Sequence, residues 1–174
     1  MKRFLNLANS LSLFRIIIAP VVAWNIISGR WMTASFLLVL SIFSDLLDGP
    51  IARKKGQESA AGGLLDHSCD AILVAVLLFV LTETHGIPLL LPVLVVVSFL
   101  QYVLDSKALS GHRLRTSFLG RSNGICYFVL ASLCIFTEAL EINLPDYFIV
   151  NFAWILITST LLSMSERLWT LLRK

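Results

Sequence analysis

Four aspartates with regular spacing stand out in an otherwise apolar sequence. They occur in residues 45–70, which read DLLDGPIARKKGQESAAGGLLDHSCD and have long apolar runs on both sides. A carboxylate near the centre of a bilayer costs about 2.5–3.5 kcal/mol on insertion scales, so four together cost on the order of 10 kcal/mol. Unless these aspartates lie near the membrane interface, a cation that prefers oxygen ligands must offset that cost.

Helical periodicity predicts that the four carboxylates form one site. At 100° per residue, Asp45 and Asp48 lie on one stripe of a helix. Asp66 and Asp70 likewise share a stripe of the following helix. The link between the two helices is short and polar, so we expect antiparallel neighbours whose stripes face each other across a cleft. No zinc-type set of cysteines and histidines accompanies the carboxylates, and we predict one or two Mg²⁺ or Mn²⁺ ions.

The small residues in the same stretch point to a bulky anionic ligand. Gly49, Ala52 and Gly62 lack bulk where a ligand would approach the backbone. Arg53 offers a fork of donors that suits phosphate oxygens. Together with a cation, these residues predict a diphosphate-binding site in which a carboxylate takes a proton from a hydroxyl. The alternative is purely structural: salt bridges between the aspartates and the basic residues 53–55 tie two helices together.

The composition indicates an all-α, polytopic membrane protein. Of the 174 residues, 57% are hydrophobic and 14% are charged, and the mean hydropathy is +0.83. We predict a single membrane domain, 1–174, in which residues 1–10 form a short interfacial helix. The net charge of +3 is modest, and we expect no nucleic-acid partner. Six apolar segments have about the length of membrane-spanning helices: 11–28, 32–53, 63–82, 87–105, 122–140 and 147–166.

The positions of the basic residues predict the orientation. With both termini in the cytoplasm, every lysine and arginine except Arg30 falls on the cytoplasmic side, as the positive-inside rule requires. The basic residues 53–55 then place the aspartates at the cytoplasmic face. We therefore expect soluble ligands of the site to come from the cytoplasm.

Residues 45–70 resemble the signature of the CDP-alcohol phosphotransferases, D-x2-D-G-x2-A-R-x8-G-x3-D-x3-D, at every fixed position. The resemblance implies six transmembrane helices, a homodimer and the transfer of a substituted phosphate from a CDP-linked lipid to an alcohol with release of CMP. It also implies a role for each motif residue. The four aspartates would bind a metal pair, with Asp70 also the general base, and the CDP moiety would be held by Gly49, Ala52, Arg53 and Gly62.

The acceptor alcohol is less clearly indicated. The run from Asn6 to Pro20 looks like the start of bacterial glycerol-3-phosphate phosphatidyltransferases, and bacterial cardiolipin synthases share a similar run. This resemblance favours CDP-diacylglycerol and sn-glycerol 3-phosphate as the substrates. It also favours a bacterial plasma membrane as the location of the protein. Ala8 departs from the proline that is common there. Within this run, interface anchoring is the alternative interpretation of Asn9 and Arg15.

We predict that an anionic acceptor binds to basic residues of the loop 107–121. These residues are Arg113, Arg115 and Arg121. Contact with anionic lipid headgroups is the alternative for them. We expect His67 and His112 to lie outside the site.

Other acceptors and other functions stay open at this point. Phosphatidylglycerol, inositol phosphate, serine or an amino-alcohol would require the same chemistry. A divalent-cation transporter would instead place acidic residues along a route across the membrane, and it would leave Gly49, Ala52 and Arg53 without a role. A non-catalytic membrane scaffold would make the entire motif accidental.

Overall fold

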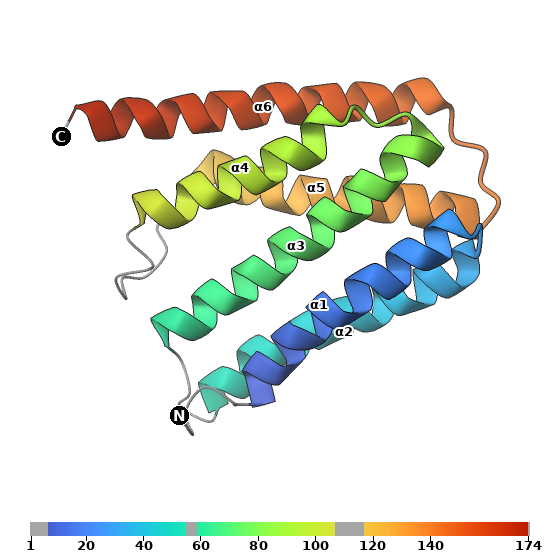
Figure 1. The fold of residues 1–174 in the computed structure, drawn as a ribbon, viewed down its shortest axis with the longest axis horizontal. Helices are drawn as coiled ribbons and strands as arrows, with labels where there is room; N and C mark the ends of the chain where they lie inside the picture. The colour runs from blue at the N-terminus through green and yellow to red at the C-terminus, as the bar shows by residue number, and fades with distance from the viewer. Residues whose placement is uncertain (1–6, 55–58, 107–116, 174) are drawn as a thin grey trace.

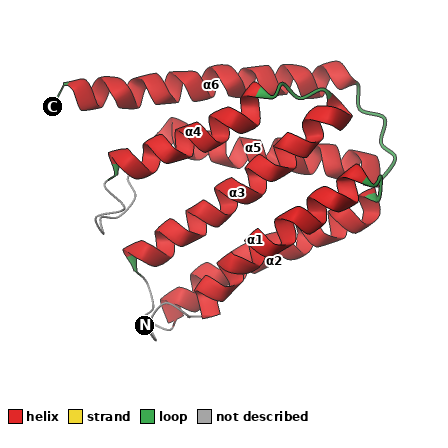
Figure 2. Ribbon diagram, in the orientation of Figure 1, coloured by secondary structure: helices red, strands yellow, loops and turns green. Residues whose placement is uncertain are grey.

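All regular structure in the described residues is α-helical (Figures 1 and 2). The computed structural model describes residues 7–54, 59–106 and 117–173. Its helices are α1 (Leu7–Ile27), α2 (Trp31–Lys54), α3 (Ala60–His85), α4 (Leu90–Asp105), α5 (Phe118–Ala139) and α6 (Asp146–Leu172). The all-α prediction is confirmed, and each predicted apolar segment corresponds to one helix. Residues 7–10, which we assigned to an interfacial helix, belong to α1.

Capping residues explain where several helices begin and end. The side chains of Ser59 and Ser117 precede α3 and α5, and each accepts a hydrogen bond from the backbone N–H three residues later, at 2.9 and 3.1 Å. Gly29 follows α1 and Gly86 follows α3, with φ angles of +67° and +64°. Glycine adopts this left-handed conformation without a Cβ clash, so both helices can stop in tight turns.

The helices run alternately in opposite directions (Figure 1). The start of α1, the end of α2, the start of α3, the end of α4, the start of α5 and the end of α6 all lie toward the left of that view. Helix α3 packs against α1, α4, α5 and α6, whereas α2 packs against α1 and α5. The two aspartate-bearing helices run antiparallel as predicted, but α1 packs more closely against each of them than they pack against each other.

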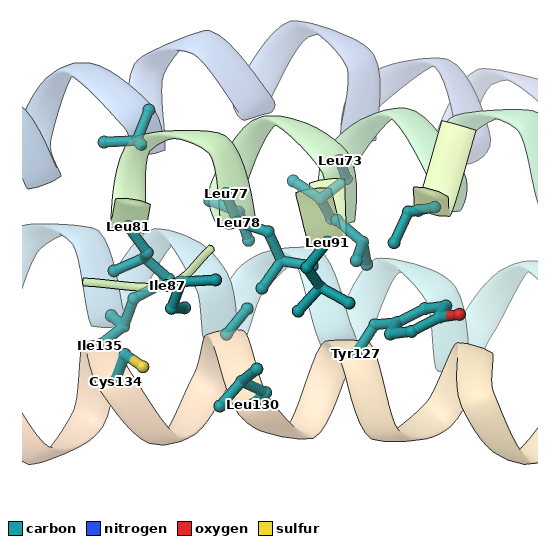
Figure 3. Close-up of a cluster of buried hydrophobic side chains, with 14 of the residues drawn as sticks. Leu73, Leu77, Leu78, Leu81, Ile87, Leu91, Tyr127, Leu130, Cys134 and Ile135 are labelled. Carbon is teal, nitrogen blue, oxygen red and sulfur yellow. The ribbon is translucent and has the colours of Figure 1, made fainter. Parts of the chain in front are cut away.

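The centre of the bundle is a tightly packed apolar core between α3 and its neighbours (Figure 3). Four leucines of α3 recur at helical spacing and are at most 2% exposed: Leu73, Leu77, Leu78 and Leu81. They meet Leu130 and Ile135 of α5 and Leu91 of α4. Between helices in a membrane such side chains gain little from the hydrophobic effect, so close van der Waals packing in this core fixes α3 relative to the helices that surround it.

The outer surface is also apolar, as expected of an integral membrane protein. Large hydrophobic side chains such as Ile17, Phe36 and Leu162 are more than 60% exposed. Four described segments are long and apolar enough to cross a membrane: Ser10–Ile27, Ala60–His85, Phe118–Ala139 and Tyr147–Thr170. Trp31–Leu46 and Leu90–Asp105 are shorter apolar stretches. The 16 residues of α4 span about 24 Å.

Candidate metal and substrate site

Three of the four motif aspartates come together at one end of the bundle. Asp45 projects from α2, whereas Asp66 and Asp70 lie one turn apart on α3. One carboxylate oxygen from each residue lies within 4.8 Å of the other two. The side chains are between 28% and 48% exposed. We call these three residues the acidic cluster, and their oxygens are ligands that suit Mg²⁺ or Mn²⁺.

The remaining motif residues are placed only in part. Helix α2 continues through the motif to Lys54, so Asp48 follows Asp45 at the i+3 position, on the same face of the helix. The side chains of residues 47–54, and with them the predicted contacts of Asp48, Gly49, Ala52 and Arg53, lie outside the described residues. Gly62 lies in the first turn of α3, where its N–H donates to Ser59.

Arg15 of α1 lies at the centre of the acidic cluster. Its side chain is 1% exposed, and its guanidinium donates hydrogen bonds to Asp45, Asp66 and Asp70. One turn earlier on α1, the Ser12 hydroxyl donates to Oδ1 of Asp66 at 3.1 Å. The interpretation of Arg15 as an interface anchor is therefore wrong. A charged residue inside an apolar segment requires a partner, and this signal was available in the sequence.

A central cavity of about 690 Å³ opens beside the acidic cluster. Residues from all six helices line it, including Asp45 and Asp70. Besides Arg15, two more arginines line it: Arg121 of α5, which we predicted as an acceptor ligand, and Arg167 of α6, which the sequence reasoning missed. Arg113 and Arg115 lie outside the described residues.

Arg167 is held in a defined position on the cavity wall. Its guanidinium carbon lies 4.8 Å from the centroid of the Tyr102 ring, and its Nη2 donates to Oγ of Ser117 at 3.2 Å. A Cβ atom at Gly120 would lie 2.8 Å from the same Nη2, so the absence of a side chain there makes room for the guanidinium. Arg167 therefore presents a fixed positive charge to the cavity.

An aromatic contact joins this arginine to the acidic cluster. The His67 and Tyr102 rings are stacked, with centroids 6.5 Å apart. Nδ1 of His67 lies 3.7 Å from Oδ2 of Asp66, which is too long for a hydrogen bond. We expected His67 to lie outside the site, but the structure places it on the cavity wall.

Comparison with known proteins agrees with the motif. The family model described as CDP-alcohol phosphatidyltransferase matches residues 5–164. The chain belongs to this family. Its relatives include the chloroplastic CDP-diacylglycerol–glycerol-3-phosphate 3-phosphatidyltransferase 1 of Oryza sativa subsp. japonica, 39% identical over 82 residues, which are 47% of this chain and 25% of the relative.

Two further relatives carry different names. The human cardiolipin synthase (CMP-forming) is 38% identical over 92 residues, covering 52% of this chain and 31% of the relative. The CDP-diacylglycerol–glycerol-3-phosphate 3-phosphatidyltransferase of Pseudomonas fluorescens is 31% identical over 85 residues, covering 47% of this chain and 44% of the relative. In all three comparisons the match covers less than half of the relative's length.

Proposed function

We propose that the protein is a membrane-embedded phosphatidyltransferase that moves a phosphatidyl group from CDP-diacylglycerol to sn-glycerol 3-phosphate and releases CMP. The observation that carries this proposal is the convergence of three motif carboxylates beside a cavity lined by Arg121 and Arg167, in a chain of this family. The relatives named as glycerol-3-phosphate phosphatidyltransferases support the choice of acceptor.

The acidic cluster and Asp48 would hold the divalent cations, which we propose to be a pair of Mg²⁺ or Mn²⁺ ions. When bound, such ions stabilise negative charge on the diphosphate and on the departing CMP. The match between the chain and the family signature supports Gly49, Ala52, Arg53 and Gly62 as the residues that hold the CDP moiety. Small residues permit close approach of the nucleotide, and the guanidinium suits its phosphate oxygens.

Asp70 is proposed as the general base. Its side chain is 44% exposed and lines the cavity, so an acceptor hydroxyl can approach it. As the acceptor oxygen bonds to the lipid-linked phosphorus, the hydroxyl proton passes to Asp70 and the bond between that phosphorus and the CMP oxygen breaks. Phosphatidylglycerol phosphate and CMP are then the products.

The acceptor's phosphate would bind at the basic wall of the cavity. Arg121 and Arg167 line the same cavity as Asp70, which supports an acceptor with a hydroxyl at one end and an anionic group at the other. Arg113 and Arg115 of the preceding loop complete the proposed set. Phosphatidylglycerol is the second candidate acceptor, because relatives named as cardiolipin synthases match slightly more than half of this chain.

The proposed setting follows from the helices and the charges. We propose one domain with six membrane-spanning helices, assembled as a homodimer in a bacterial plasma membrane. The distribution of lysine and arginine supports cytoplasmic termini and a cytoplasmic site. The cation-transporter alternative lacks support, because the described acidic residues that line the cavity, Asp45 in the second half of α2 and Asp70 in the first half of α3, lie in the same half of the bundle.

A direct assay tests the proposal. Purified protein in detergent is given CDP-diacylglycerol, Mg²⁺ or Mn²⁺, and one acceptor from a panel: sn-glycerol 3-phosphate, phosphatidylglycerol, inositol phosphate or serine. We expect CMP release with sn-glycerol 3-phosphate and loss of that release in excess EDTA. Release with phosphatidylglycerol alone would reassign the acceptor. Folded protein that releases no CMP with any acceptor would exclude the enzyme.

A further inference from the structure

Arg15 contacts the same three carboxylates that would hold a divalent cation. Its Nη1 donates to Oδ1 of both Asp45 and Asp70, and its Nη2 donates to Oδ1 of Asp66. These are the same three residues whose oxygens converge within 4.8 Å. We infer that Arg15 is the counter-ion of the acidic cluster and competes with a divalent cation for its carboxylates. This inference rests on the proposed metal-dependent function.

Burial explains why the acidic cluster needs a counter-ion. Arg15 is 1% exposed within an apolar helix, where an unpaired guanidinium would be strongly unfavourable. Three converging carboxylates would also repel one another if no positive charge lay between them. The pairing therefore stabilises both partners, and the hydrogen bond from Ser12 to Asp66 holds α1 in register with the cluster.

The competition follows from charge and from shared atoms. Arg15 supplies one positive charge against three carboxylates, and this surplus of acidic groups attracts a divalent cation. The guanidinium already uses one oxygen of each carboxylate. Two positive groups at such short range repel each other, so cation binding must weaken the contacts of Arg15. Because Arg15 also lines the cavity, an anionic substrate there would offer its guanidinium an alternative partner.

Linkage makes this competition measurable without any turnover. If Arg15 weakens cation binding, the cation must weaken the Arg15 contacts by the same factor. The probe is Mn²⁺, whose free concentration is followed by electron paramagnetic resonance. The sample is the full-length protein in detergent after removal of bound metal with EDTA. The variants are Arg15→Gln, which removes the charge, and Arg15→Lys, which keeps the charge but loses the fork of donors.

We expect Arg15→Gln to bind Mn²⁺ more tightly than wild type and to be less stable than wild type when no metal is bound. Arg15→Gln should bind Mn²⁺ about tenfold more tightly than wild type, within the usual range of coupling between two sites. In EDTA its melting temperature should fall, and Mn²⁺ should raise that temperature by more than it does in wild type. Arg15→Lys should bind Mn²⁺ with intermediate affinity. Arg30→Gln, the same substitution at the opposite end of the bundle, should change none of these values.

Two outcomes would overturn the inference. One is folded Arg15→Gln protein that binds Mn²⁺ no more tightly than wild type. The other outcome applies if Arg15→Gln does not fold, and it is Arg15→Lys protein that binds Mn²⁺ with wild-type affinity. The inference requires tighter Mn²⁺ binding in that variant, because lysine lacks the forked contact with the carboxylates. Failure of the proposed function looks different, since wild-type protein would bind Mn²⁺ and yet release no CMP.

Discussion

The two ends of the helical bundle each bury a basic side chain against carboxylates, in two contrasting ways. At the end with the acidic cluster, Arg15 contacts three aspartates. At the other end, His85 is buried, with its Nε2 3.6 Å from Oε1 of Glu138. The ring of His85 also packs edge-on against Trp31, with centroids 5.7 Å apart.

The two ends differ in the number of carboxylates around the basic side chain and in the size of the adjacent cavity. His85 meets one half-exposed carboxylate, next to a cleft of about 370 Å³ to which Glu138 contributes. Arg15 is outnumbered by carboxylates, and the group opens onto a cavity of about 690 Å³. A single contact between a histidine and one carboxylate can be explained by helix packing alone. Three partly exposed carboxylates around one arginine, beside a cavity, indicate a site for a cation and its ligands.

The sharpest test of this comparison removes one carboxylate charge at each end. Asp70→Asn should lower the rate of CMP release by about 10³-fold, because the proposed base and a metal ligand are lost together. Glu138→Gln removes a carboxylate charge at the opposite end and should leave the rate within about twofold of wild type. Both rates are measured at saturating CDP-diacylglycerol, and thermal unfolding checks that both variants are folded.

If Asp70→Asn and Glu138→Gln lower the rate of CMP release equally, the acidic cluster is no more important for catalysis than the carboxylate at the opposite end of the bundle. Wild-type activity in Asp70→Asn would remove Asp70 from the role of base.

A second test concerns the basic wall of the cavity. Arg121→Ala and Arg167→Ala should each raise the KM for sn-glycerol 3-phosphate by about tenfold to 100-fold, since a hydrogen bond to a charged group contributes about 1.5–3 kcal/mol. The KM for CDP-diacylglycerol should change much less. Arg30→Ala, which removes an arginine at the opposite end, should leave both values unchanged. If the KM for sn-glycerol 3-phosphate is unchanged in both variants, these arginines do not bind the acceptor and serve only to orient the protein in the membrane.

A smaller effect is expected when the position of Arg167 is disturbed without removing its charge. The Cβ of Gly120→Ala would lie 2.8 Å from Nη2 of Arg167 and 2.9 Å from Oγ of Ser117, so the hydrogen-bonded pair that holds this guanidinium must shift to make room. The acceptor KM should rise a few-fold, less than in Arg167→Ala. Gly124→Ala, at a glycine with nothing near its Cβ position, is the matched control. Identical KM values in Gly120→Ala and wild type would show that the exact position of the guanidinium does not matter.

The sequence predicted the helices well and the contacts between them less well. Apolar segments of spanning length and glycines such as Gly86 determine where helices lie, and both are local features. The role of Arg15 depends on Asp66, 51 residues away. It also depends on α1 lying between α2 and α3, and no local periodicity encodes that packing. Arg167 was missed for a similar reason, because its place on the cavity wall arises from contacts with α4 and α5.

The smallest predicted effect compares glycines at the two ends of α3. Gly86 has a φ angle of +64°, and its Cβ position meets only Val150 at an ordinary 3.8 Å. Gly86→Ala should therefore destabilise the protein by about 1–2 kcal/mol through backbone strain alone. Gly63 lies inside α3 near the acidic cluster, with nothing within 4 Å of its Cβ position. Gly63→Ala should be neutral or stabilising by up to about 1 kcal/mol. Thermal unfolding in detergent compares the two variants, and a lower melting temperature for Gly63→Ala than for Gly86→Ala would contradict the assignment of strain to the turn after α3.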